Sequence, residues 1–123
     1  MNTIAVDAMG GDSAPIDIVK GAIKAKEQGV DVVLCGDKDL INPYLENYEI
    51  PVFDFPQVIS MDEDPLRAIR NKKNASIVGC MQLLKDKKVQ AVFSAGSTGA
   101  TLISAISILG KHKGVIRPVI ASV

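Results

Sequence analysis

The sequence predicts an α/β protein with a mostly parallel sheet that helices cover on both faces. Segments typical of strands alternate with segments typical of helices along the whole chain. The strand-like segments are continuous apolar runs rather than alternations of apolar and polar residues, a pattern typical of parallel strands that are buried on both faces. The chain has 123 residues, 47% of them hydrophobic, so it is long enough for one cooperative core. We therefore expect residues 1–123 to form one α/β domain.

Three strands and two helices are expected in the first half of the chain. The strands are short apolar runs at residues 3–7 (TIAVD), 30–35 (VDVVLC) and 52–55 (VFDF). Helical patterns lie between them at residues 15–27 and 40–47. Side chains that accept hydrogen bonds from free N–H groups favour helix starts. We therefore expect Asp12 or Ser13 to cap the first helix and Asp39 to cap the second.

The second half is expected to add three helices and two strands. The helices are a short one near residues 64–71, a longer one that runs from an Asn74 cap to about Lys87, and an apolar one at residues 98–110. We expect the apolar helix to be buried on most sides. The strands are residues 91–94 and residues 119–123, where the chain stops inside an apolar run. That ending leads us to expect a fragment, or an incompletely ordered part, of a longer protein.

The composition argues against two large classes of partner. Fourteen basic residues balance fourteen acidic ones, with one histidine and 4% aromatic residues, so no nucleic-acid partner is expected. The start of the chain is not a signal peptide, and no apolar run approaches the roughly 18 residues that span a bilayer.

Cys35 and Cys80 form no Cys-x-x-Cys pair and are expected to be buried thiols in a reducing compartment. We expect a cytoplasmic protein.

Two glycine-rich turns follow the first and fourth expected strands, AMGGDSAP at residues 8–15 and AGSTGA at residues 95–100. The carboxyl ends of parallel strands meet at one edge of a sheet, where open α/β sheets bind ligands. Glycine lets the backbone approach a ligand, and the helix after each turn presents unpaired N–H groups, so we expect an anion such as phosphate to bind there. The alternative is that the glycines only form tight turns. The candidate residues are Asp7, Met9, Gly10, Gly11, Asp12, Gly96, Ser97, Thr98 and Gly99.

Three roles are open for Asp7: it accepts backbone N–H groups and holds its turn, orients a cation, or binds a metal. No other acidic residues lie at metal-ligand spacing, so neither a metal nor another cofactor is expected. Ser94, Ser97 and Thr98 are interpreted as donors to an anion or as helix caps. His112, the one histidine, lies in the cationic segment KHKG and is expected to be exposed, which argues against a Ser-His-Asp mechanism.

The segment MDEDPLRAIRNKKNAS at residues 61–76 concentrates charge. Asp64 is expected to cap its helix, and Glu63 or Asp64 to pair with Arg67. One interpretation is a solvated helix with local ion pairs. The other is that one of its cations reaches the phosphate, since an arginine fork suits phosphate oxygens. The candidates are Arg67, Arg70, Lys72 and Lys73.

Four motifs occur in one order: DAMGGD at residues 7–12, DPLRAIRNKKNAS at 64–76, SAGSTGA at 94–100 and IRPVIA at 116–121. In order and spacing the chain resembles the phosphate acyltransferases of bacterial phospholipid synthesis, the PlsX family, over essentially all of its length. Members of that family are longer, so the chain is similar to the N-terminal part of a longer α/β enzyme. The family often has histidine where Ser13 stands and asparagine where Ser97 stands, so no role that needs an imidazole or an amide is carried over.

The resemblance implies a reaction in which an acyl group passes from the thioester of acyl carrier protein to inorganic phosphate, giving acyl phosphate for phospholipid synthesis. Because phosphate is itself the nucleophile, no serine or cysteine needs activation, and no catalytic residue is assigned. The resemblance also implies a fold similar to phosphate acetyltransferases and isopropylmalate dehydrogenases, a homodimer, and peripheral association with the inner face of the membrane through regions absent from this chain.

Two other function classes fit the same pattern. One is an enzyme of similar fold, either a phosphate acetyltransferase that uses acetyl-CoA or a metal-dependent decarboxylating dehydrogenase. The other is a non-catalytic domain that senses a phosphorylated metabolite. Consumption of the thioester separates the acyltransferases from the sensor, and the choice of substrate separates the enzymes from one another.

Overall fold

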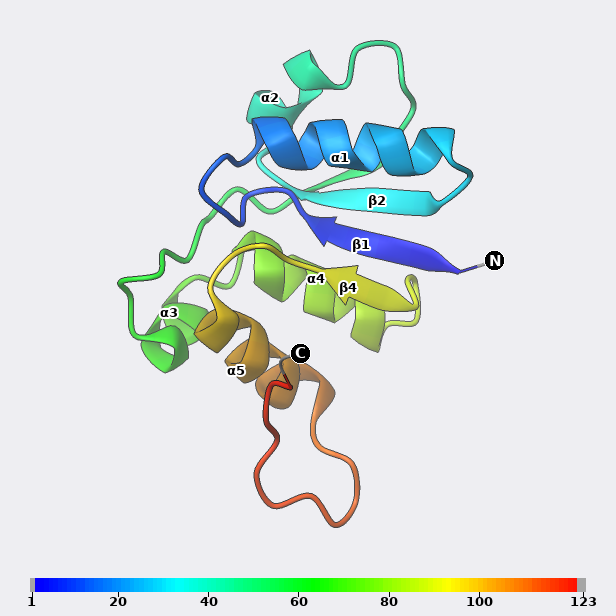
Figure 1. Ribbon diagram of the computed structural model, residues 1–123. Helices are drawn as coiled ribbons and strands as arrows, with labels where there is room; N and C mark the ends of the chain where they lie inside the picture. Colours follow the sequence, from blue (N-terminus) through cyan, green and yellow to red (C-terminus); the bar gives the residue numbers. More distant parts are fainter. Residues whose placement is uncertain (1, 122–123) are drawn as a thin grey trace.

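A four-stranded parallel sheet forms the centre of the fold (Figure 1). The computed structural model describes residues 2–121. The strands β1 (Thr3–Asp7), β2 (Asp31–Gly36), β3 (Val52–Asp54) and β4 (Ala91–Phe93) lie in the order β3-β2-β1-β4. Each neighbouring pair is parallel, which confirms the predicted α/β class.

Helices cover both faces of the sheet, as predicted. α1 (Ile16–Glu27) lies against one face and α4 (Ser76–Lys85) against the other (Figure 1). The remaining helices are α2 (Lys38–Ile41), the 3₁₀ helix η1 (Asn42–Tyr44), α3 (Pro65–Asn71) and α5 (Thr98–Leu109). α5 packs mainly on α3 and α4, below the sheet in Figure 1.

Alternate residues of β1 and β2 supply the two halves of the core. On the face beneath α1, Val6, Val32 and Leu34 pack with Val19 and Ile23 of the helix, and none of the five is more than 7% exposed. Burial of one such side chain contributes about 1.5–3 kcal/mol. This packing fixes β1 at the middle of the sheet, so the turn that follows it starts from a rigid point.

On the opposite face, Ala5, Val33 and Cys35 pack with Cys80 and Leu83 of α4. Both cysteines are buried free thiols, as predicted. A hydrogen bond with the Cys35 thiol, together with burial, raises the pKa of Cys80 above its usual range. Cys80 therefore stays a protonated thiol at neutral pH and serves the packing of the core.

The expected caps of the first two helices, α1 and α2, are wrong. α1 begins after Pro15, and neither Asp12 nor Ser13 caps it with a side chain. Asp37, rather than Asp39, caps α2: its backbone is extended and its carboxylate accepts the N–H of Asp39 at 3.1 Å. The sequence contains two aspartates that suit this cap, and only the backbone geometry distinguishes them.

Two helices are also shorter than predicted. α2 gives way to η1 because Pro43 lacks the N–H that would continue an α-helical ladder. α4 ends at Lys85, and Lys87, just beyond, has a positive φ of 60°. Asn74 does not cap α4, because its side chain makes no such bond and its N–H instead donates to the Oε1 atom of Gln57 at 3.0 Å.

α5 is less buried than its apolar sequence predicts. Ala100 and Ser104 are its buried residues, whereas Leu109 is 42% exposed. The expectation of burial on most sides is therefore wrong, because α3 and α4 cover only one side of this helix. In contrast, Asp64 caps α3 as predicted, accepting the N–H of Arg67 at 3.3 Å.

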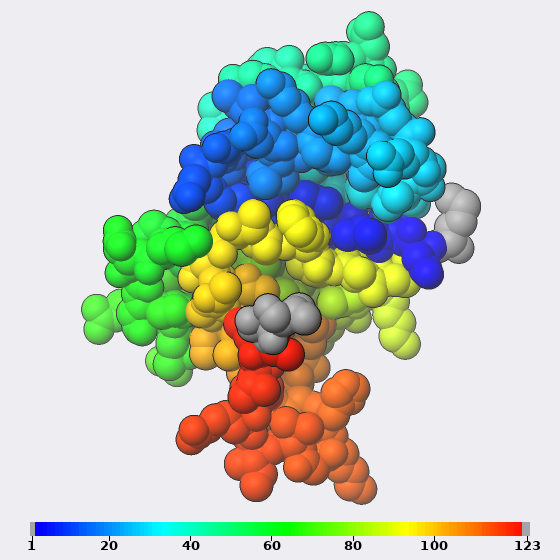
Figure 2. Space-filling view, viewed as in Figure 1, coloured from blue at the N-terminus to red at the C-terminus, as the bar shows by residue number. Residues whose placement is uncertain are grey.

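The predicted fifth strand is not formed by the residues that the structure describes. Residues 119–121 have no strand structure, and Val119 is 77% exposed. In Figure 2 the segment after α5, orange to red, projects from the rest of the molecule. Residues 122–123, the last two of the predicted strand, lie outside the described residues. Within residues 2–121, no helix has the length and apolar character required to cross a membrane.

Candidate functional site

The two glycine-rich turns pack directly against each other. β1 and β4 are parallel neighbours, so both turns leave the sheet at the same edge. A Cβ atom on Gly10 would lie 2.9 Å from the backbone nitrogen of Gly96 and 3.0 Å from its Cα. Real Cβ atoms do not come so close, so this backbone contact requires glycine at both positions.

Gly11 has a second requirement, because its φ of +108° is disfavoured for residues with a side chain. A Cβ there would also lie 3.3 Å from Ala95 of the other turn. Gly99, in the first turn of α5, faces the ring of Pro65 at the start of α3. The glycines thus bring the two turns into contact with each other and the start of α5 into contact with the start of α3.

Asp7, at the end of β1, is 3% exposed and accepts three hydrogen bonds. Its Oδ1 atom accepts from the Ser76 hydroxyl of α4 and from the N–H of Met9 at 3.2 Å. Its Oδ2 atom accepts from the Ser94 hydroxyl at 2.8 Å. A buried carboxylate is costly unless donors surround it, and these three donors compensate. Of the roles left open for Asp7, the geometry shows that of an acceptor that holds its turn.

The hydroxyls of Ser94 and Ser97 form hydrogen bonds within the protein. The Ser94 hydroxyl also accepts the N–H of Gly96 at 3.1 Å, so it connects Asp7 to the neighbouring turn. Ser97 caps α5 by accepting the N–H of Ala100 at 3.1 Å, which was one of its two predicted roles. Thr98 is the first residue of α5 and is exposed.

Backbone N–H groups remain free at both turns. Among residues 2–121, no acceptor takes the N–H groups of Gly11, Asp12, Ser97, Thr98 and Gly99. The last three belong to the N-terminus of a 12-residue helix, where the macrodipole adds a partial positive charge. These amides place partial positive charge at this edge of the sheet.

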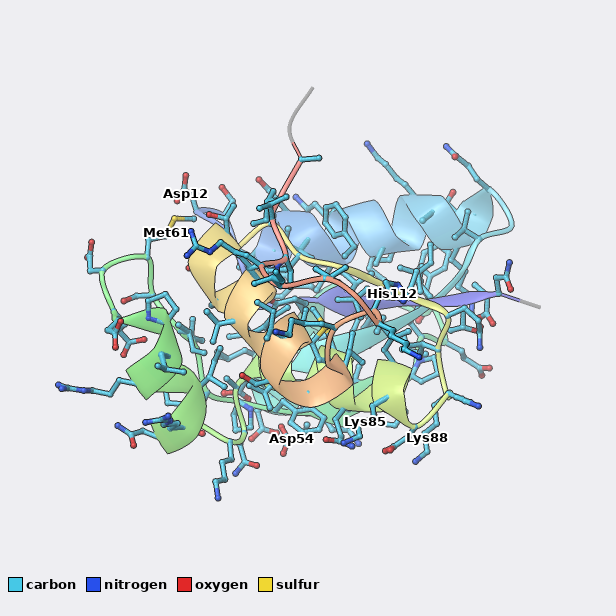
Figure 3. All side chains as sticks on the ribbon, turned by 90° about the horizontal axis from the view of Figure 1, so that it is seen from below. Asp12, Asp54, Met61, Lys85, Lys88 and His112 are labelled. Carbon is cyan, nitrogen blue, oxygen red and sulfur yellow. The ribbon has the colours of Figure 1, made fainter. Side chains whose placement is uncertain are left out.

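A cavity of about 230 Å³ opens beside these turns. Figure 3 shows two of its lining residues, Asp12 and Met61, at the same end of the molecule. The two glycine turns form two of its walls. The third wall is the segment of residues 58–61, part of the connection between β3 and α3. The lining consists of Met9, Gly10, Gly11, Asp12, Val58, Ile59, Ser60, Met61, Gly96 and Ser97.

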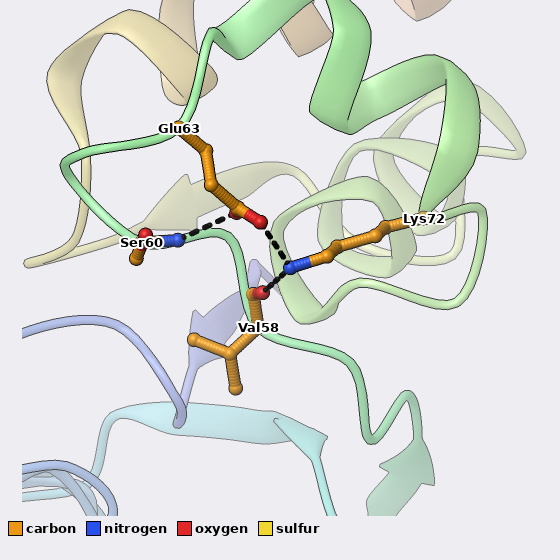
Figure 4. A network of polar contacts seen from close by, with 4 residues as sticks. All are labelled: Val58, Ser60, Glu63 and Lys72. Atoms are coloured by element: carbon orange, nitrogen blue, oxygen red, sulfur yellow. Dashed lines mark hydrogen bonds and ion pairs between the residues drawn. The ribbon is translucent and has the colours of Figure 1, made fainter.

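The structure does not bring the candidate cations into this cavity. Arg67 lies in a separate depression along α3, and Arg70 and Lys73 are exposed. Lys72 lies near the third wall: its Nζ donates to Glu63 Oε1 at 2.5 Å and to the carbonyl of Val58 at 2.7 Å (Figure 4). This is the one ion pair in the part of the chain that the structure describes.

The partner of Glu63 is therefore Lys72 rather than the predicted Arg67. The hydrogen bond from Lys72, and then the N–H of Ser60, hold the pKa of Glu63 below its ordinary value. The described residues contain no group of three side chains that suits a metal ion. His112 is exposed, as predicted. Sequence reasoning missed Ser76 as a partner of Asp7, and no motif signalled it.

Comparison with known proteins finds similarity over the whole chain. Residues 2–123 match the family described as "Fatty acid synthesis protein". A phosphate acyltransferase of Gloeothece citriformis is 50% identical over 98% of this chain and 36% of its own length. Phosphate acyltransferases of Desulforamulus reducens and Syntrophomonas wolfei are 47% and 45% identical, over 99% and 98% of this chain and 38% and 40% of their own lengths. The chain therefore spans about two fifths of the length of these relatives.

Proposed function

This chain belongs to the family of fatty acid synthesis proteins, and on that basis we propose that it transfers a fatty acyl group from acyl-acyl carrier protein to inorganic phosphate. The product is acyl phosphate, a precursor for phospholipid synthesis. Relatives named phosphate acyltransferase, 45–50% identical to the chain, support the transfer to phosphate. The resemblance to the PlsX family, which the four motifs carry, supports acyl carrier protein as the donor.

One structural observation carries the proposal: two glycine turns meet and leave free N–H groups beside one cavity. Such groups at a helix N-terminus bind phosphate through directed hydrogen bonds and the helix dipole. The cavity lining contains no lysine or arginine and has one carboxylate, that of Asp12, so we assign phosphate binding within this chain to backbone N–H groups. Of the free amides, those of Gly11, Asp12 and Ser97 belong to lining residues, and those of Thr98 and Gly99 follow at the start of α5.

The acyl transfer requires little from the protein beyond holding phosphate at this place. A phosphate oxygen attacks the thioester carbonyl carbon, the carbonyl oxygen becomes an oxyanion, and the C–S bond then breaks to release the thiolate. Holding phosphate beside the carbonyl removes much of the entropic barrier, and N–H donors stabilise the oxyanion. Asp7 does not act on the substrate; it positions both turns. That Met9, Gly10 and Gly96 line the same cavity supports their contact with phosphate as part of the proposal. Contact with Arg67, Arg70 or Lys73 stays a prediction.

The proposal extends to the context in which the enzyme works. We infer a cytoplasmic homodimer that associates peripherally with the inner face of the membrane through regions absent from this chain. We also infer that the chain is the N-terminal part of a longer α/β enzyme. The greater length of the relatives supports this, as does the exposed edge strand β4, where Phe93 is 53% exposed. Parallel sheets are normally covered on both faces, so this exposed aromatic side chain suits further chain.

The direct test uses the protein expressed from its complete gene. Acyl-acyl carrier protein is incubated with and without phosphate, and acyl phosphate is trapped with hydroxylamine. We expect thiol release and hydroxamate to depend on phosphate. Faster turnover of acetyl-CoA would favour a phosphate acetyltransferase, and NAD reduction with a hydroxy acid would favour a dehydrogenase. Thermal stabilisation by phosphate without thioester consumption would favour a sensor.

A further inference from the structure

The third wall of the cavity exposes apolar side chains next to a polar site. Val58 is 40% exposed and Met61 is 65% exposed, and both line the cavity with the glycine turns. Ile59, between them, is 9% exposed and packs into the cluster formed by α3, α4 and α5. The segment thus anchors one side chain in the core and presents two at the cavity.

Several hydrogen bonds fix this wall in place. Gln57 donates its N–H to the carbonyl of Asn74 and accepts the N–H of Ser76, both at 3.1 Å. The carbonyl of Val58 accepts from Lys72 at 2.7 Å. The N–H of Ser60 donates to Glu63 Oε2 at 2.9 Å, and Figure 4 shows this bond together with the contacts of Lys72 with Glu63 and Val58. These bonds hold the connecting segment at successive residues, beside the glycine turns with which it lines the cavity.

We propose that Val58 and Met61 form the subsite for the acyl chain of the thioester. This inference rests on the proposed function, which brings an apolar chain and a phosphate to one reacting carbon. The lining of the cavity matches these two parts of the substrates. The glycine turns offer free amides to phosphate, and the segment of residues 58–61 offers exposed apolar side chains to the acyl carbons. Covering these side chains with acyl methylenes also removes apolar surface from water, which favours binding of longer chains.

The test compares acyl donors of different length in the protein expressed from its complete gene. In the double variant Val58→Ser/Met61→Ser, the ratio of kcat/KM for a long-chain donor to that for a short-chain donor should fall about tenfold. The phosphate KM should not change. Leu66→Ser is the matched control, since Leu66 is 45% exposed on α3 and does not line this cavity. An unaltered chain-length ratio in the double variant would overturn the subsite.

A binding measurement separates this inference from the proposed function. Calorimetry without phosphate compares octanoyl pantetheine with acetyl pantetheine as probes. We expect the wild type to bind the octanoyl thioester about tenfold more tightly and the double variant to lose that preference. Equal affinities in the wild type, or a preference that survives in the double variant, would refute the subsite. Failure to form acyl phosphate while the binding preference holds would refute the proposed reaction alone.

Discussion

The carboxylate of Asp7 accepts a hydrogen bond from the hydroxyl of Ser94 at 2.8 Å, across 87 positions of sequence. The same hydroxyl accepts the N–H of Gly96 at 3.1 Å, so the end of β1 sets the position of an amide on the turn after β4. Anion binding by backbone depends on such placement, because each N–H must point at an oxygen. The relationship makes Asp7 a positioning residue that both turns share.

Replacing Asp7 should disturb folding and the site together. In Asp7→Ala the buried hydroxyl of Ser76 and the N–H of Met9 lose their acceptor. We expect the free energy of unfolding to fall by about 2–4 kcal/mol, because unsatisfied buried donors are costly. Urea denaturation measures this change. The exposed Asp39, replaced by alanine, is the control and should change stability by less than about 0.5 kcal/mol. Equal effects of the two substitutions would contradict the role of Asp7.

A side chain at Gly11 should weaken phosphate binding. Valine is strained at a φ of +108° and would press on Ala95 of the other turn. We expect Gly11→Val to raise the phosphate KM about tenfold or more, measured by steady-state kinetics. Gly21→Ala is the matched control, since a Cβ there meets nothing within 4 Å. An unchanged phosphate KM in Gly11→Val would remove the turn from the site.

Breaking the ion pair between Lys72 and Glu63 should loosen the apolar wall. In Lys72→Met the carbonyl of Val58 loses its donor, so we expect the KM for a long-chain acyl donor to rise several-fold with little change in the phosphate KM. Lys88→Met is the control, because Lys88 is exposed and lies beyond α4, outside the lining of the cavity. A rise in the phosphate KM alone would show that Lys72 serves phosphate instead.

The pKa of Glu63 gives an independent measure of that ion pair. It lies below the ordinary value of 4.5 because Lys72 donates to the carboxylate. The stabilisation by this pair is therefore present above the unfolded pKa and is lost as the pH falls through the lowered folded pKa. Titration by NMR should find the lowered pKa in the wild type and an upward shift in Lys72→Met. An identical pKa in both proteins would exclude the ion pair in solution.

The two cysteines should resist thiol reagents while the protein is folded. Cys80 has a raised pKa because of Cys35 and burial, and only the thiolate reacts. We expect labelling by iodoacetamide at pH 8 to be at least about a hundredfold slower in the native protein than in denaturant. Rapid labelling of the native protein would show that the core opens around α4.

The parts of the fold that could be predicted follow from local rules. The apolar runs of β1 and β2 are buried on both faces, so their sequences alone identify parallel strands. The same rule places the two glycine turns at one edge. Asp64 could be assigned as a cap because it precedes Pro65, a residue that favours the first turn of a helix.

The parts that could not be predicted depend on tertiary contacts. Ser76 reaches Asp7 only because α4 packs beneath β1, and a sequence separation of 69 residues gives no sign of it. Lys72 reaches Glu63 across nine positions of sequence, from the other end of α3, whereas helical spacing favoured Arg67. The exposure of α5 depends on which elements cover it, which its apolar composition does not specify.

The central claim is that amides of both turns hold one phosphate. Titration of ¹⁵N-labelled protein with inorganic phosphate, followed by NMR, tests it most directly. We predict that the amide signals of Gly11 and Asp12 on one turn and of Ser97 on the other shift together with a single dissociation constant. Shifts confined to one turn, or absent from both, would contradict the account.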